Sequence, residues 1–452
     1  MVDFVRARSQ KTVLVSATAL CTLIAGAAVA YDPSEPVVDM DRNIWIPAED
    51  DREAVLRVGA VYNDEEFQIR YEFETDDPSW YHQYLVYEEG EWVRYGGAQA
   101  GPEPDGLYED RISMMLDDNS VEGFAAYGGF ITSHEGMRSL TSAVDSDEVS
   151  AHPHLGQTLG RSDVRKFIPQ SREGEGAEVS WDGVHDEEAL EQLRADGVFL
   201  DLWQWRAHRS NPVGLADNGY VLEYRHSSSG SSMFSNNWDD DTEQPLWMFD
   251  PDATGIAAIE AEGIFAREYG QDDYYYLAED FAVPFDPDHD WQDGDTLPFR
   301  FLSAGEGSRA AIAADGRWED GVWRVRLTRT LEAPDPMDSK TLEDDGVYPV
   351  AFAVHEGQVG ARWHLVSMPS SLGLGNDEAD IVAVRTEGDL DAAEVEWTDV
   401  PVMYPSQMVW QFLNSEHPGA AQVRQGVDVE TEHSFRDLVE RLPEWELRTI
   451  VE

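Results

Sequence analysis

The sequence predicts an all-β protein built on an antiparallel β-sandwich, with a few short helices and a C-terminal appendage. Short stretches rich in β-branched and aromatic residues recur between Gly, Pro and Asp turns, as strands of a sandwich do. Apolar and polar residues alternate through Phe67–Phe73 and again through Trp323–Leu327, which is the period of a strand with one buried face. Hydrophobic residues make up 42% of the chain and include 15 Trp, so a packed core is expected and disorder of the whole chain is excluded.

Residues 1–30 are typical of an export signal. Three basic residues precede the apolar run Val13–Val29, and Ala28-Val29-Ala30 provides a small-x-small cleavage site before Tyr31. We therefore expect an exported, periplasmic protein whose mature chain begins at Tyr31. The alternative is an uncleaved N-terminal membrane anchor, because a run of this length approaches a membrane span.

Residues 31–397 form the predicted sandwich domain. Its strands are expected, in chain order, at Ala54–Val61, Phe67–Phe73, Tyr84–Val86, Val198–Trp205, Tyr220–Tyr224, Val322–Leu327, Tyr348–Val354 and Arg362–Ser367.

Helical signals are fewer. Asp186–Ala195 reads as a short amphipathic helix that ends before Gly197, and Ser434–Leu442 reads as a second. The long segment His226–Asp241 is expected to be a loop. Residues 398–452 change from strands to a chain punctuated by proline, so we expect a C-terminal appendage there.

The charge of the chain is strongly one-sided. Asp and Glu number 90 against 32 Lys and Arg, which gives a formal charge of −58 and a pI near 4.2. Such a chain repels a phosphate backbone, so nucleic acid is excluded as a main partner. Lys11, Lys166 and Lys340 are the only lysines. Many carboxylates with few lysines indicate a halophilic, acidic protein whose self-repulsion is screened by salt.

Cys21 is the single cysteine and lies inside the predicted export signal. The mature chain would therefore contain no thiol. Disulfides, thiolate metal sites and a cysteine nucleophile are excluded for it.

Two histidines lie in surroundings of interest. His134 follows Gly128-Gly129-Phe130-Ile131-Thr132-Ser133, and His433 follows Val429-Glu430-Thr431-Glu432. A c-type haem site has the pattern C-x-x-C-H, in which two thiols bind the haem and the histidine binds its iron. Both places have the histidine and neither has a thiol, so covalent haem c is excluded.

The sequence resembles the ethylbenzene-dehydrogenase-related haem-binding family, which includes gamma subunits of DMSO-reductase-type molybdoenzymes and related periplasmic cytochromes. The resemblance spans most of the mature chain and rests on WYHQYLVYEEGEWVRYG (Trp80–Gly96), GLYEDRISMMLDD (Gly106–Asp118), DVRKFIPQSR (Asp163–Arg172), FLDLWQWRAHRSNP (Phe199–Pro212), Trp291–Pro298, Gly307–Arg309 and YPVAFAVHEGQVGARWHLVSMP (Tyr348–Pro369).

This resemblance implies a haem-binding β-sandwich for periplasmic electron transfer. The implied partners are a periplasmic redox protein or subunits of a molybdoenzyme. Relatives with c-type motifs have cysteines at the positions of Phe130 and Ser133, and again at those of Val429 and Glu432. In the gamma subunits a Met and a Lys hold haem b, and the Lys lies in a W-x-W-K strand. That position is Arg206 here, and a guanidinium cannot bind iron.

We therefore expect a non-covalent haem b, with His134 as the leading candidate to bind the iron. His208 lies two residues beyond Arg206 and is expected on the same face of that strand. The candidate cofactor-binding residues are His134, Met137, His208, Met114, Met115, Phe130, Trp203 and Trp205.

Two kinds of function remain open. The first is an exported haem-b protein that transfers electrons or assists a redox enzyme, without catalytic residues of its own. The second is a haem-free binding or structural relative that kept only the sandwich. For each candidate Met or Trp, packing in the core is the simpler interpretation.

The charge predicts that folding depends on salt. Removing residues 1–30 takes away three basic residues and one acidic residue, so the mature charge is −60. Self-repulsion should lower the melting temperature in dilute buffer, and molar NaCl should raise it. Thermal unfolding followed by circular dichroism at both salt concentrations checks this expectation. Equal melting temperatures would contradict it.

Overall fold

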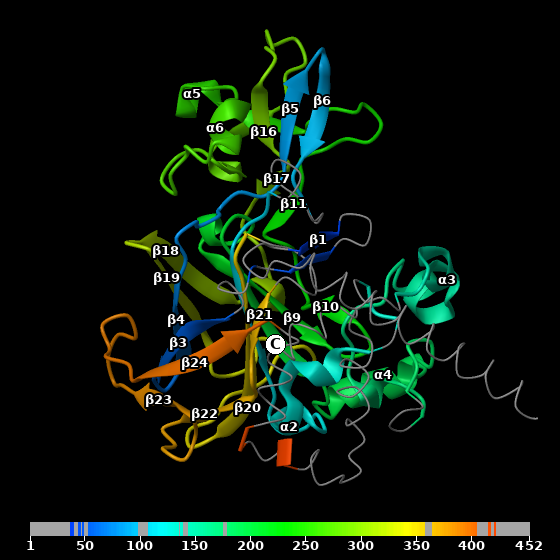
Figure 1. Ribbon diagram of the computed structural model, residues 1–452, viewed down its shortest axis with the longest axis vertical. Helices are drawn as coiled ribbons and strands as arrows, with labels where there is room; N and C mark the ends of the chain where they lie inside the picture. The colour runs from blue at the N-terminus through cyan, green and yellow to red at the C-terminus, as the bar shows by residue number, and fades with distance from the viewer. Residues whose placement is uncertain are drawn as a thin grey trace, which may run out of the picture.

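The computed structural model shows a large β-barrel with a smaller lobe above it (Figure 1). It describes residues 37–39, 44–46, 48, 53–97, 107–134, 136–138, 143–174, 179–357, 364–404, 415–416 and 420–421.

The main sheet has 13 strands and closes on itself, since its last strand, β4, also pairs with β3. Ten strands form the closed ring, in the order β3-β23-β22-β20-β7-β8-β9-β18-β19-β4. Neighbours are antiparallel except β22–β23 and β23–β3. Closure removes the open edges of the sheet, which would otherwise template aggregation. The predicted all-β class is confirmed, and the sandwich takes the form of a flattened barrel.

The bounds of the ring strands are β3 (Glu53–Tyr62), β4 (Glu66–Glu74), β7 (Arg111–Leu116), β8 (Leu200–Arg206), β9 (Leu215–Val221), β18 (Ile312–Glu319), β19 (Val322–Thr330), β20 (Val347–His355), β22 (Ser370–Leu374) and β23 (Ile381–Arg385). Three further strands complete the sheet: β10 (Arg225–Ser227) beside β9, β21 (Leu365–Ser367) beside β20, and β24 (Trp397–Met403) beside β3.

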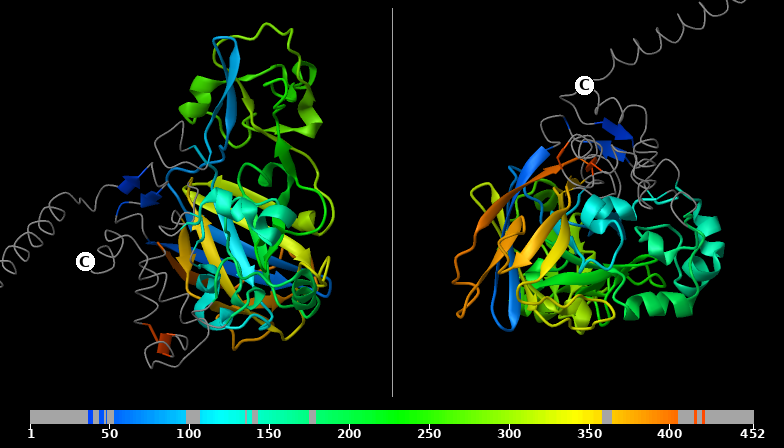
Figure 2. Two further views of the ribbon diagram at one scale, coloured as in Figure 1. Left: turned by 90° about the vertical axis from the view of Figure 1, so that its right-hand side faces the viewer. Right: turned by 90° about the horizontal axis from the view of Figure 1, so that it is seen from below.

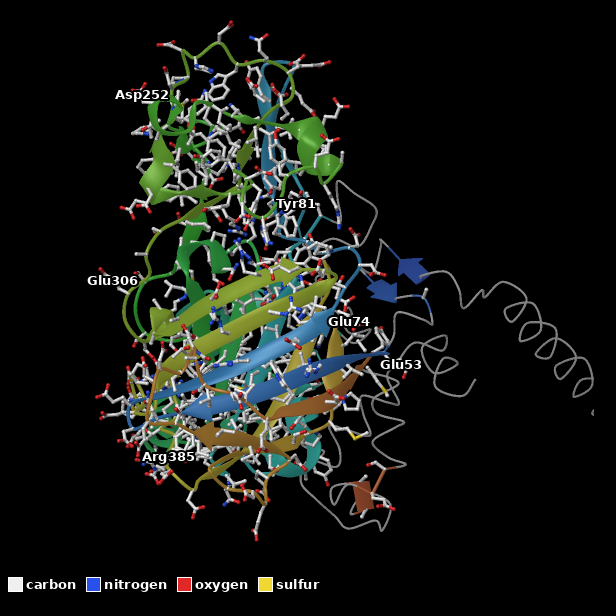
Figure 3. All side chains as sticks on the ribbon, turned by 90° about the vertical axis from the view of Figure 1, so that its left-hand side faces the viewer. Glu53, Glu74, Tyr81, Asp252, Glu306 and Arg385 are labelled. Carbon is white, nitrogen blue, oxygen red and sulfur yellow. The ribbon has the colours of Figure 1, made fainter. Side chains whose placement is uncertain are left out.

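The upper lobe is built on a four-stranded sheet. Its strands are β13 (Ile259–Glu260), β16 (Asp295–Pro298), β5 (Tyr84–Glu88) and β6 (Glu91–Tyr95). Around it lie β12 (Trp247–Phe249), β15 (Ala282–Pro284), α5 (Pro251–Thr254), α6 (Ala261–Phe265) and the 3-10 turn η7 (Glu279–Phe281). A small sheet of β11 (Phe234–Asn236), β17 (Arg300–Leu302) and β14 (Leu277–Ala278) lies between lobe and barrel (Figure 1). Figure 3 shows Tyr81 at this junction.

A layer of short helices lies beside the barrel (Figure 2). It contains α2 (Phe124–Tyr127), η2 (Gly128–Thr132), α3 (Ser146–Ala151), η3 (Pro153–Thr158), η4 (Pro169–Ser171) and α4 (Glu187–Ala195). Two other 3-10 turns, η6 (Asn211–Val213) and η8 (Ser308–Ala310), flank β9 and β18, and β1 (Val37–Asp39) pairs with β2 (Ile44–Ile46).

Most predicted elements occur in the structure. The helix predicted at 186–195 is α4: Asp186 caps it by accepting a hydrogen bond from the Ala189 N–H, and Gly197 follows its end with a φ of 77°. The strand expected at Tyr220–Tyr224 instead ends at Val221, because the chain turns there into β10. The loop expected at 226–241 contains β11, and the helix expected at 434–442 lies outside the described residues.

Strand pairing of the main sheet continues beyond residue 397, where we expected the appendage to begin. β24 pairs with β3 from Trp397↔Gly59 to Met403↔Glu53. Residues 422–452, which include His433, lie outside the described residues.

The barrel interior is filled by large aromatic side chains. Trp323 packs edge-on against Trp205, with ring centroids 4.9 Å apart, and donates a hydrogen bond from Nε1 to Asp110. Gly316 lies against the same indole, since a Cβ there would be 2.5 Å from a Trp205 ring carbon. The interior is therefore packed too tightly at this level to hold a ligand.

A buried ion pair crosses one end of the interior. Arg329 donates to Asp201 over 2.8 Å, both side chains are at most 1% exposed, and the guanidinium lies 4.6 Å from the centre of the Trp203 ring. Asp201 also accepts a hydrogen bond from the Lys340 N–H. The Lys340 ammonium, itself buried, binds Asp118 over 2.6 Å. This network ties β8 and β19 to the segment before β20.

Breaking this pair should destabilise the barrel strongly. Asp201→Asn leaves a buried guanidinium without its counter-charge, which costs about 3–5 kcal/mol. The matched control is Asp272→Asn, because the Arg317–Asp272 pair is largely exposed and its loss should cost less than about 1 kcal/mol. Urea unfolding at constant salt measures both. Equal losses would contradict the structural role of the buried pair.

Candidate functional site

The side chains of β20, β7 and β8 alternate between the inner and the outer face of the barrel wall. Ile112, Met114 and Leu116 of β7 are buried on the inner face, whereas Arg111, Ser113 and Met115 alternate with them and are half-buried. Pairing register extends these alternate positions across the strands. The outer face thus carries three rows: His355, Arg111 and Arg206; then Ala353, Ser113 and Gln204; then Ala351, Met115 and Leu202.

Three of the candidate residues lie on the inner face. Met114 pairs with Trp203 across β7 and β8, and its Sδ accepts a 3.6 Å hydrogen bond from the Tyr71 hydroxyl. Trp203 and Trp205 are fully buried. These three side chains are part of the barrel core, the simpler interpretation of their sequence pattern.

Phe130 and Met115 come together on the outer face. Phe130, in η2, is 8% exposed and belongs to a hydrophobic cluster with Leu202 and Ala351, against which Met115 also packs. A Cβ added at Gly129 would lie 3.6 Å from the Met115 Sδ, so the thioether faces the backbone of η2. The helical layer therefore covers the third row of the outer face.

His134 lies in this helical layer, where its ring contacts Phe167. Its Nε2 lies 3.1 Å from the Phe167 carbonyl oxygen, and its ring stacks on that of Phe167 at 4.0 Å. Burial, and then Arg172, lowers the pKa of His134 to about 3. Met137 is buried nearby, where its N–H donates to the His134 carbonyl oxygen.

His208 lies in different surroundings from those expected. Strand β8 ends at Arg206 and the next four residues form a turn, so strand alternation does not extend to His208. Its Nδ1 donates to the Trp80 carbonyl oxygen over 2.9 Å, and its ring lies 5.8 Å from that of His82. Burial lowers the pKa of His208 to about 4. The expectation that it shares the outer face with Arg206 is wrong, because the strand stops first.

Arg206 is held by an ion pair. Its Nη1 donates to Asp217 over 2.5 Å and its Nη2 donates to Gln204 over 2.8 Å. Asp217 also binds Arg309 over 2.9 Å. Arg206 therefore lies at one end of the outer face as a charged side chain. A guanidinium cannot bind a metal ion.

Two further cations near this face were missed in the sequence. Arg225 has no carboxylate partner among the described residues, and burial, with Arg165 and Arg206 facing it, lowers its pKa to about 9. The Lys166 ammonium contacts only the hydroxyls of Thr132, at 3.1 Å, and Ser133, at 3.4 Å, in the described part of the chain. Burial, followed by Arg225, lowers the Lys166 pKa to about 8. Two half-buried cations with no carboxylate partner among the described residues are notable in a chain with 90 acidic residues.

His355 is the third residue that the candidate set lacked. It ends β20, pairs with Arg111, and stacks on His364 with ring centroids 4.7 Å apart. Its Nδ1 is buried without a hydrogen-bond partner among the described residues. Burial, then Arg111, holds the pKa of His355 well below its usual value, so the ring is neutral. Alternation with Val350, Phe352 and Val354 could have placed it on the outer face.

The described residues contain no group of three or more His, Cys, Asp or Glu side chains that could hold a bare metal ion. They also contain no helix that is long and apolar enough to cross a membrane. A haem needs only one or two protein ligands, because its macrocycle supplies four nitrogens.

Comparison with known proteins identifies the family. A stretch of 99 residues is 29% identical to cytochrome c-552 of Stutzerimonas stutzeri, and it covers 21% of this chain and 33% of that cytochrome. The match thus spans about a third of the cytochrome's length. The family model described as ethylbenzene dehydrogenase matches residues 22–367, which extend to the end of β21. The chain therefore belongs to the ethylbenzene dehydrogenase family, a family of haem-binding redox subunits.

Proposed function

We propose that this protein binds haem b without a covalent link on the outer face of β20, β7 and β8, and that it serves as an exported electron-transfer or accessory protein of a redox system. The observation that carries the proposal is the middle row of that face. Ala353 and Ser113 are small, half-buried and outside the hydrophobic clusters, while both flanking rows carry groups suited to a haem.

The donor set fits haem b better than haem c. The chain offers a neutral imidazole in His355 and a thioether in Met115, both of which bind haem iron in proteins. No cysteine lies among the described residues to form a thioether link. Bound haem would supply a one-electron iron couple; the protein's own part is to hold it, orient it and limit its contact with water.

The cations supply what the carboxylates of a haem need. Arg111 and Arg225 lie on or beside the outer face, in a chain whose formal charge is −58. Without local cations this charge would repel a dianionic ligand. Charge-assisted hydrogen bonds from guanidinium groups to carboxylates are among the stronger polar contacts in proteins.

The predicted export signal and the family membership both support a role in a periplasmic redox system. A molybdoenzyme-type subunit or another periplasmic redox protein is the proposed partner. We assign no catalytic reaction to this chain itself.

A haem-free binding protein is the second candidate, and two observations favour it. Arg206 forms an ion pair with Asp217, and the His134 Nε2 is hydrogen-bonded to the Phe167 carbonyl oxygen. The side chains at two positions that bind haem in relatives are therefore already engaged in contacts within this chain.

Reconstitution with hemin decides between a haem-binding and a haem-free protein. The purified protein mixed with hemin should develop a Soret band, and acid and organic solvent should extract all the haem. Ala353→Phe should abolish the band by filling the middle row, whereas Ala313→Phe, at an exposed position of β18, should leave it unchanged. If no Soret band develops with the folded protein in molar salt, the haem-free alternative stands.

The role of the cations has its own test. Arg225→Gln removes one charge-assisted contact, worth about 1.5–3 kcal/mol, and should weaken haem binding by about tenfold or more. Haem dimethyl ester, which lacks the carboxylates, should bind the wild type and the variant equally. Arg324→Gln on exposed β19 is the control and should bind haem like the wild type. A variant that binds haem with unchanged affinity would exclude Arg225 from the site.

A further inference from the structure

The two ends of the outer face carry one metal donor each. On β20, His355 lies four residues beyond Ala351, and Ala351 pairs with Met115 of β7. At about 3.3 Å per residue, the rows of His355 and Met115 are about 13 Å apart along the strands. Side chains on strands stand off the sheet and lean along it, so these two can approach each other from opposite ends.

The middle row, between the row of His355 and the row of Met115, has short side chains on β20 and β7. Ala353 and Ser113 lie directly between the row of His355 and the row of Met115. Neither side chain rises far enough from the sheet to fill the space in which an imidazole and a thioether would meet. Gln204, at the end of this row, accepts a hydrogen bond from Arg206 and donates one to the Ser113 hydroxyl over 3.4 Å, so its amide stays at the β8 side of the row.

Both donors are in a state suited to iron. The buried Nδ1 of His355 lacks a hydrogen-bond partner among the described residues, a costly condition that a metal bond would relieve. Met115 is half-buried, and its flexible, unbranched side chain can turn from Gly129 towards the middle row.

We propose that His355 and Met115 are the two protein ligands of the haem iron in this chain. The inference rests on the proposed function and deepens it, because it names the two residues that would hold the iron.

The other candidates fit this role less well. Arg206 stays charged and binds Asp217, and Met114 points into the barrel, where it accepts a hydrogen bond from Tyr71. The His134 Nε2 is hydrogen-bonded to Phe167, so binding iron would cost that contact. His355 lies in the same row as Arg206, two strands away, and so offers a nitrogen at the same level of the face.

The experiment compares the wild type, His355→Ala, Met115→Leu and His134→Ala, each reconstituted with hemin in molar salt. Absorption and electron paramagnetic resonance spectra report the ligands of the iron. The wild type should be low-spin and six-coordinate, with the near-infrared charge-transfer band of methionine bound to ferric iron. His355→Ala should turn high-spin, bind haem at least about tenfold more weakly, and regain the low-spin spectrum with added imidazole.

Met115→Leu should keep haem but lose the near-infrared band, while His134→Ala should match the wild type. Circular dichroism checks that each variant is folded, and His355→Gln replaces the alanine variant if that one is not. A low-spin spectrum unchanged by either His355 variant would overturn the assignment, as would the same spectral change in His134→Ala. If the folded wild type binds no haem at all, the proposed function fails first and the assignment falls with it.

Discussion

The alternation of β7, β8 and β20 is the constraint on which the rest of the molecule depends. These strands form a single-layer wall, so each residue faces either the packed barrel or the helical layer outside. Met114 and Met115 are neighbours in sequence, yet one accepts a hydrogen bond from Tyr71 inside and the other contacts η2 outside. A shift of register by one residue would exchange every such pair and place Arg111 in the apolar interior.

The sequence predicted the strands of the barrel better than its closure. Period-two alternation locates β4, β19 and β20 because each has one buried face. The pairing of β3 with β4 on one side and with both β23 and β24 on the other depends on contacts between segments far apart in the chain. Local patterns carry no information about which strands meet, so a closed barrel could not be distinguished from an open sandwich.

For the candidate site, motif-based reasoning and geometry selected different residues. The resemblance directed attention to His134, but a histidine in a haem motif without thiols can also hydrogen-bond to a carbonyl, as it does to Phe167. His355 lies in the segment Tyr348–Pro369 that carries the resemblance but outside any C-x-x-C-H pattern, and its place opposite Arg111 follows from the pairing of β20 with β7. Lys166 and Arg225 were missed because their lack of a carboxylate partner among the described residues becomes visible only in the folded chain.

The two described lysines show how few amines this protein presents. Lys340 is buried beside Asp118, and Lys166 is half-buried against two hydroxyls. No lysine is exposed on the part of the chain that the structure describes. Amine-directed reagents such as acylating esters and aldehydes therefore have no accessible lysine on that surface, and covalent immobilisation or cross-linking through the described surface would have to use its abundant carboxylates.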